Sequence, residues 1–240
     1  MSTTWRLVHD LDTGYDAAGQ MAADLALLDD VVAGASPALR LYRWSPPALS
    51  LGRFQPDDDV DHDACGRLGV DLVRRPTGGR ALLHGADLMY AVAMRRPDDV
   101  AGAGVDAVYR LLAGGLIAGL GELGIAAAIA HADGPAGPVC FAGQQGADLR
   151  VGERKLCGSA QVHRDGAVLQ HGAILLDRLP FDETDLLRGA SERDGRARLR
   201  AATVTLRELG GPVDAATVAA ALVEGFTSSL DVRFTSRLGA

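Results

Sequence analysis

Two side chains in this sequence have the chemistry for acyl transfer, a cysteine and a lysine on neighbouring segments. Cys140 follows a loop rich in glycine and proline, and Lys155 lies downstream in a strand-like run. Lys155 is the only lysine among the 24 lysine and arginine residues of the chain. Lysine is a compact donor with a tunable pKa, whereas arginine is a planar fork that stays charged. A lone lysine indicates that an ammonium is required there, although chance alone also leaves one lysine somewhere.

Cys140 is the strongest candidate nucleophile. A thiolate attacks an acyl thioester to form a new thioester, which is ready for transfer to an amine. A nearby ammonium stabilises the thiolate over the thiol. The alternative is a buried structural cysteine between Val139 and Phe141, and spacing alone does not decide between the two. Cys65 and Cys157 are interpreted as packed residues.

The segment from Arg74 to His84 reads RRPTGGRALLH. It contains a turn and has a basic side chain at one end and a histidine at the other. Its paired glycines allow close approach of the backbone to a ligand, and their amides can face an oxygen-rich group. His84 and His171 each follow an apolar run, so either could donate to an acyl carbonyl, act as a base or be a structural histidine. Ser159 and Gln161 lie in a strand-like pattern and point either into a pocket or outward.

The overall composition excludes several classes of protein. A net charge of −7 over 240 residues argues against a general nucleic-acid binder, which needs a broad basic surface. No signal peptide is expected at the N-terminus. Glycines and Glu122 interrupt the most apolar region, 111–130, so no membrane-spanning helix is expected. The three cysteines have neither metal-site spacing nor an even-numbered disulfide framework, which favours a reduced, cytoplasmic protein.

The hydrophobic periodicity predicts an α+β fold, with a mixed or largely antiparallel sheet flanked by helices. Helices are expected at Asp16–Val32, Val60–Leu68, Gly104–Leu123, Ser191–Arg200 and Asp214–Leu230. Strands are expected at Trp5–His9, Leu39–Trp44, Ala48–Gly52, Val70–Arg74, Leu88–Met94, Ile125–Ala130, Ala147–Val151, Lys155–Val162 and Gly166–Leu176. We expect a single catalytic domain over 1–240, with 180–240 a helical C-terminal portion packed on it.

Five segments together resemble the lipoate branch of the biotin/lipoate protein ligase superfamily along most of the chain. They are QMAADLALLDDV (Gln20–Val31), LRLYRWSPPALSLGRFQ (Leu39–Gln55), RRPTGGRALLH (Arg74–His84), DLRVGERKLCGSAQ (Asp148–Gln161) and VLQHGAILLD (Val168–Asp177). The resemblance implies the catalytic-domain fold of that superfamily. Within the branch, the chain is more similar to single-domain bacterial octanoyltransferases than to ATP-dependent lipoate–protein ligases. Cys140 precedes the lysine strand as in those transferases, and Gly78–Arg80 reads Gly-Gly-Arg where ligases commonly carry a third glycine.

The resemblance implies a ping-pong reaction. Cys140 would take octanoyl from octanoyl-acyl carrier protein, and the lysine of a lipoyl-domain or glycine-cleavage H-type protein would then take it as an amide. Lys155 would stabilise the thiolate and polarise the acyl carbonyl. The acyl slot would be lined by Arg75, Gly78, Gly79, Arg80, His84, Ser159, Gln161 and His171. No metal or other cofactor is implied, and neither nucleic acid nor membrane is an expected partner.

Two alternatives remain open, and the chain departs from the family at two positions. An ATP-dependent lipoate–protein ligase would need ATP and magnesium, and a non-catalytic paralogue would bind the acyl group or its carrier without turnover. Gly85 follows His84 where much of the family has an acidic residue, which leaves Asp87 as a substitute. Cys157 occupies a position that is usually small or aliphatic. Both departures bear on the shape of the pocket.

Overall fold

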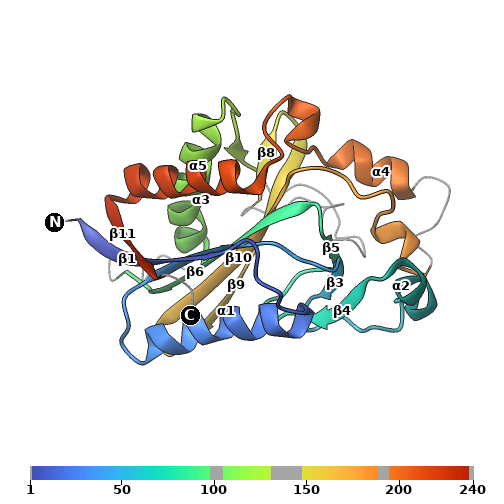
Figure 1. Cartoon of the computed structure of the whole chain (residues 1–240), viewed down its shortest axis with the longest axis horizontal. Helices are drawn as coiled ribbons and strands as arrows, with labels where there is room; N and C mark the ends of the chain where they lie inside the picture. Colours follow the sequence, from blue (N-terminus) through green and yellow to red (C-terminus); the bar gives the residue numbers. More distant parts are fainter. Residues whose placement is uncertain (1, 98–104, 131–147, 189–194, 238–240) are drawn as a thin grey trace.

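The computed structural model describes residues 2–97, 105–130, 148–188 and 195–237, whose strands form a large and a small sheet (Figure 1). In the large sheet the strand order is β11-β1-β2-β6-β10-β9-β8-β7. The pairs β11–β1 and β1–β2 are parallel, and every later pair is antiparallel. This confirms the predicted α+β fold with a largely antiparallel sheet. The strands are β1 (Thr3–Asp10), β2 (Ala38–Tyr42), β6 (Asp87–Arg95), β7 (Ala128–Ile129), β8 (Leu149–Val151), β9 (Arg154–Arg164), β10 (Ala167–Leu175) and β11 (Val232–Arg237).

Helices cover both faces of the large sheet, α1 (Ala17–Val32) on one face and α3 (Val105–Glu122) with α5 (Ala215–Leu230) on the other (Figure 1). Strand β6 separates the two apolar layers, because alternate side chains of a strand point to opposite faces. Met89, Ala91 and Ala93 pack in the α1 layer. The intervening residues Leu88, Tyr90, Val92 and Met94 pack in the α3–α5 layer.

Local signals in the sequence account for two of these helices. α1 and α5 begin after Asp16 and Asp214, whose carboxylates accept the N–H groups of Gly19 and Thr217 at 2.7 and 2.8 Å. Such N-caps satisfy amides that have no partner within the helix. The predicted boundaries of both helices agree with the structure to within one residue.

The glycines of α3 allow α3 and α5 to approach each other closely. A Cβ atom at Gly225 would lie 2.1 Å from the backbone nitrogen of Gly119. A Cβ atom at Gly115 would lie 2.6 Å from the ring of Phe226. Gly115 and Gly119, which interrupt the apolar run of α3, therefore serve helix packing. No helix among the described residues is long and apolar enough to cross a membrane.

The small sheet lies beside one end of α1, with α2 next to it (Figure 1). Its order is β4-β3-β5, from Asp71–Arg74, Ala48–Leu51 and Leu82–His84. Helix α2 spans His62–Leu68 rather than starting at Val60, because Asp61 caps the helix and Val60 forms a β-bridge with Leu187. The turn between β4 and β5 carries the paired glycines and faces the large sheet.

The C-terminal part of the chain is less purely helical than expected. It contains η2 (Glu183–Asp185), α4 (Gly195–Ala202), η3 (Arg207–Leu209) and α5, and it then ends in β11. β11 was not predicted, and it pairs in parallel with β1. Pairing between strands at opposite ends of the chain leaves no local pattern in the sequence. The predicted strand Ile125–Ala130 is also shorter, since only β7 within it is paired.

Candidate active site

A cavity of about 150 Å³ lies between α1, the turn of the small sheet and strands β9 and β10. It brings together predicted site residues from segments that are far apart in the sequence. Those that line it are Arg75, Gly78, Gly79, His84, Lys155, Ser159, Gln161 and His171. Cys140, the predicted nucleophile, lies outside the described residues.

Lys155 is the charged centre of this cavity. Its side chain is 1% exposed, and Nζ lies 2.7 Å from Oδ2 of Asp148, which is also buried. An ammonium removed from water to this degree needs a carboxylate beside it, because the desolvation of an unpaired charge costs several kcal/mol. The backbone is also held, since the N–H of Val204 donates to the Lys155 carbonyl at 2.9 Å. The ammonium is therefore held in one place.

His84 is held between an acid and an alcohol. Nδ1 lies 2.6 Å from Oδ2 of Asp87, and Nε2 lies 2.8 Å from Oγ of Ser50. The indole of Trp44 stacks on the imidazole, with ring centroids 4.7 Å apart. Partners on both ring nitrogens and an indole on one face leave the imidazole no freedom to rotate. The ring lines the cavity in a single orientation.

Asp87 provides the carboxylate beside His84, two residues after Gly85. Gly85 has φ +136°, a conformation that residues with a side chain rarely adopt, and its N–H donates to Oδ1 of Asp87 at 3.0 Å. A Cβ atom at this position would also lie 3.1 Å from Pro47. The carboxylate that reaches His84 therefore comes from the start of β6.

His171 is held in the same manner from the opposite side. Nδ1 lies 2.9 Å from Oδ2 of Asp24, and Nε2 lies 2.7 Å from Oγ1 of Thr77. Asp24 also accepts from Arg40 at 2.8 Å and from the hydroxyl of Tyr42 at 2.9 Å. Burial raises the pKa of Tyr42 well above its ordinary value, and the charge on Asp24 raises it further. One buried carboxylate therefore joins α1, β2 and β10.

Arg75 holds the glycine turn closed. Its guanidinium donates to the carbonyls of Gly78 at 2.9 and 3.1 Å, of Arg80 at 2.7 Å and of Ser50 at 2.9 Å. It also donates to Oγ of Ser50 at 3.1 Å. A planar fork can satisfy several carbonyls at once, which an ammonium cannot do in this geometry. Arg75 thereby connects the turn to the strand that carries Ser50.

The position of Arg80 differs from the prediction. Its side chain is exposed and does not line the cavity, because the turn directs only its carbonyl inward, to Arg75. The turn also packs tightly on β3: a Cβ atom at Gly52 would lie 2.0 Å from the carbonyl oxygen of Gly79. This close contact requires glycine at position 52.

Comparisons with known proteins show the family of this chain. The family model for the lipoyl protein ligase A/B catalytic domain matches residues 16–227. The chain belongs to this family. The predicted lipoate branch is thereby confirmed.

The relatives of this lipoyl ligase-family chain include transferases. It is 40% identical to octanoyltransferase LipM of Symbiobacterium thermophilum over 98% of this chain and 89% of the relative. It is 41% identical to octanoyltransferase LipM of Kyrpidia tusciae over 96% and 88%. Among solved structures, a lipoate-protein ligase A bound with ATP is 26% identical, with a TM-score of 0.79 over 99% of this chain and 89% of that one. The predicted catalytic fold is confirmed.

Ser159 and Gln161 belong to a chain of polar groups that crosses the neighbouring strands β9, β10 and β6. Oγ of Ser159 lies 2.6 Å from the hydroxyl of Tyr90, which accepts from Gln170 at 2.7 Å. Gln161 donates to Oε1 of Gln170 at 2.6 Å, and His163 lies 2.8 Å from Oε1 of Gln161. Ser159 and Gln161 line the cavity, and these hydrogen bonds connect them to Tyr90 and Gln170 of the neighbouring strands.

Cys157, the second departure from the family pattern, is a core residue. Burial raises the pKa of its thiol to about 12, and the carboxylate of Asp148 contributes, while Ser159 and Lys155 oppose the shift. At neutral pH Cys157 is therefore protonated and a poor nucleophile. Cys65 is also buried. The interpretation of both as packed residues is confirmed.

The carboxylates and hydroxyls that hold the site were not among the predicted residues: Asp24, Ser50, Thr77 and Asp148. For Asp24 a signal was present in the sequence. It falls on the buried stripe of α1 with Met21, Leu28 and Val31. An acid on an apolar stripe needs a buried partner. The other three lie in segments whose pattern gives no such signal.

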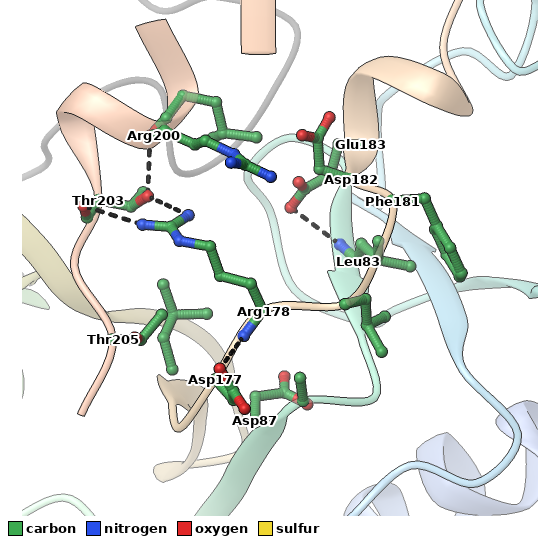
Figure 2. A pocket seen from close by; sticks show the side chains of 14 residues that line it. Leu83, Asp87, Asp177, Arg178, Phe181, Asp182, Glu183, Arg200, Thr203 and Thr205 are labelled. Atoms are coloured by element: carbon green, nitrogen blue, oxygen red, sulfur yellow. Dashed lines mark hydrogen bonds between the residues drawn. The ribbon is translucent and has the colours of Figure 1, made fainter. Parts of the chain in front are cut away.

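A second cavity, of about 60 Å³, lies on the other side of β5 (Figure 2). Leu82 and His84 face the first cavity and Leu83 faces the second, as strand alternation requires. Figure 2 shows Glu183 above the N–H of Leu83, which donates to Oε1 at 3.2 Å. Burial raises the pKa of Glu183 to about 7, and Asp182 and Asp87 add to the shift.

The raised pKa of Glu183 makes the stability of the protein depend on pH. Because the folded pKa lies above the ordinary value of 4.5, the folded state holds this proton more tightly than the unfolded state. We expect this contribution to be complete below pH ~4.5 and lost as the pH rises through 7, a change of about 3 kcal/mol. Urea unfolding from pH 5 to 8 measures it, and Glu183→Gln should flatten the profile. An equally steep decline in Glu183→Gln would assign the effect to another group.

Proposed function

We propose that this protein transfers an octanoyl group from octanoyl-acyl carrier protein to the lysine of a lipoyl-domain or glycine-cleavage H-type protein, through a thioester on Cys140. Octanoyl transfer is the activity named for relatives about 40% identical over nearly the whole chain. The observation that carries the proposal is Lys155, a buried ammonium paired with Asp148 in a cavity with an apolar wall.

The first half-reaction exchanges one thioester for another. The thiolate of Cys140 attacks the acyl carbonyl carbon, the bond from that carbon to the carrier's sulfur breaks, and the carrier leaves as a thiol after taking up a proton. Negative charge develops on the acyl oxygen during the attack. An ammonium fixed near that oxygen stabilises this charge without reorganising, since Asp148 already holds Nζ in place.

In the second half-reaction the neutral amine of the acceptor lysine attacks the Cys140 thioester. The C–S bond breaks, an amide forms, the amine loses a proton and Cys140 is restored as a thiolate. Neither ATP nor a metal is consumed, which separates this route from that of an ATP-dependent ligase. The assignment of Cys140 rests on its position in the sequence ahead of the lysine strand. The thiol must be reduced, and we therefore place the enzyme in the cytoplasm.

Mass spectrometry of the intact protein tests the covalent step. After incubation with octanoyl-acyl carrier protein and no ATP, we expect one octanoyl adduct on Cys140. Cys140→Ala should form no adduct, and Cys65→Ala, which removes another free thiol, should still form it.

Three other outcomes would each contradict the proposal. Transfer to the acceptor without any adduct would indicate direct transfer. Exchange of pyrophosphate into ATP that depends on octanoate or lipoate would identify a ligase. Carrier binding with neither adduct nor transfer would identify a non-catalytic paralogue.

A further inference from the structure

A groove of about 570 Å³ lies against the acyl cavity, on the same face of the large sheet. Its floor is apolar and consists of Met21, Leu25 and Leu28 of α1 and Val162 of β9. Its rim carries the guanidinium groups of Arg53, Arg74 and Arg164. Nothing in the proposed reaction uses this groove.

The groove continues the cavity along one strand and one helix. Gly158 and Ala160 line the cavity, whereas Val162 and Arg164, further along β9, line the groove. Alternate residues of a strand face the same side, and Val162 lies about 7 Å beyond Ala160. The two hollows therefore lie end to end.

Two residues form the partition between the cavity and the groove. Among the described residues, only Met21 and Arg75 line both hollows. Arg75 is held rigidly by its hydrogen bonds to the turn and to Ser50. Met21 is 6% exposed and has no such anchor. Its unbranched thioether adapts readily to the shape of its surroundings. Met21 is thus the part of the partition that a substitution can remove.

We propose that Met21 sets the length of the acyl chain that this enzyme accepts. The inference rests on the proposed function, in which the acyl carbonyl lies at Lys155 and the chain runs along Gly158 and Ala160. The chain then ends against the thioether of Met21. Without this side chain the cavity opens into the groove, where Leu25, Leu28 and Val162 offer apolar surface for further methylenes. Each methylene that is fully buried strengthens binding by about fourfold.

Calorimetric titration of the whole protein with octanoate and with dodecanoate tests this role apart from catalysis. We expect Met21→Ala to raise the ratio of dodecanoate to octanoate affinity by at least about tenfold, since several methylenes gain apolar contact. Met94→Ala is the matched control. Met94 is 5% exposed and packs in the opposite layer against α3 and α5, so its truncation should leave the ratio unchanged.

A second variant guards against a folding defect in the first. Met21→Phe places a larger side chain at the partition, and we expect it to shift the preference toward hexanoate. An unchanged ratio in both folded variants would overturn the inference. If the wild-type protein binds no octanoate, both this inference and the acyl cavity are wrong. If the variants change the preferred chain length as expected but no Cys140 adduct forms, only the proposed thioester is contradicted.

Discussion

Lys155→Arg is expected to lower the rate of octanoyl transfer on the order of 100-fold or more, although it keeps the positive charge. Nζ lies 2.7 Å from Asp148 at a site that is 1% exposed, and a longer, planar guanidinium does not reproduce that position. The larger group would displace its charge from the acyl oxygen. A requirement for an ammonium explains why lysine occurs here in a chain that otherwise uses arginine.

Single-turnover acylation of Cys140 across a pH series measures this effect. If Lys155 stabilises the thiolate, the pH–rate profile of the variant should have a lower maximum and should also shift to higher pH. A purely structural role would not produce the shift. Arg154→Lys is the control, since Arg154 is the adjacent residue of β9 and its side chain is 44% exposed. That exchange should leave the rate unchanged. Wild-type rates in Lys155→Arg would refute the assigned role.

Asp24→Ala is expected to destabilise the protein by about 3–5 kcal/mol. The substitution removes one of the two carboxylates that pair with the buried guanidinium of Arg40, at 2.8 Å, and leaves only Asp10 at 2.7 Å. It also removes the acceptor for the hydroxyl of Tyr42 and the carboxylate beside His171. Unpaired polar groups in the interior each carry a desolvation penalty, because water cannot replace the lost partner.

Urea unfolding at constant pH measures this loss. Asp30→Ala is the matched control, because Asp30 also lies on α1 and pairs with Arg6, but its side chain is 46% exposed. Surface ion pairs contribute about 1 kcal/mol or less, so the control should change stability little. Similar effects of the two substitutions would show that Asp24 does not anchor the buried network.

Much of the fold followed from periodicity and caps. The stripe of α1, its cap at Asp16 and the alternation of β6 are local features, since each depends on residues a few positions apart. The candidate site residues were likewise chosen from local chemistry, as with Lys155 and the two glycines of the turn. The direction in which a residue of the turn points was harder to predict. The carbonyl of Arg80 points inward, to Arg75, whereas its side chain is exposed.

By itself, then, the sequence determined most of the elements and the family, and it supplied candidate side chains for acyl transfer. Only the tertiary structure decided how those side chains are held. Asp24 and His171 are 147 positions apart, and their hydrogen bond exists because α1 packs on β10. The same holds for Met21 and Arg75, which come from separate segments and line both the cavity and the groove. Hydrogen bonds and van der Waals contacts act over a few ångströms, so partners far apart in the sequence become identifiable only once the chain has folded.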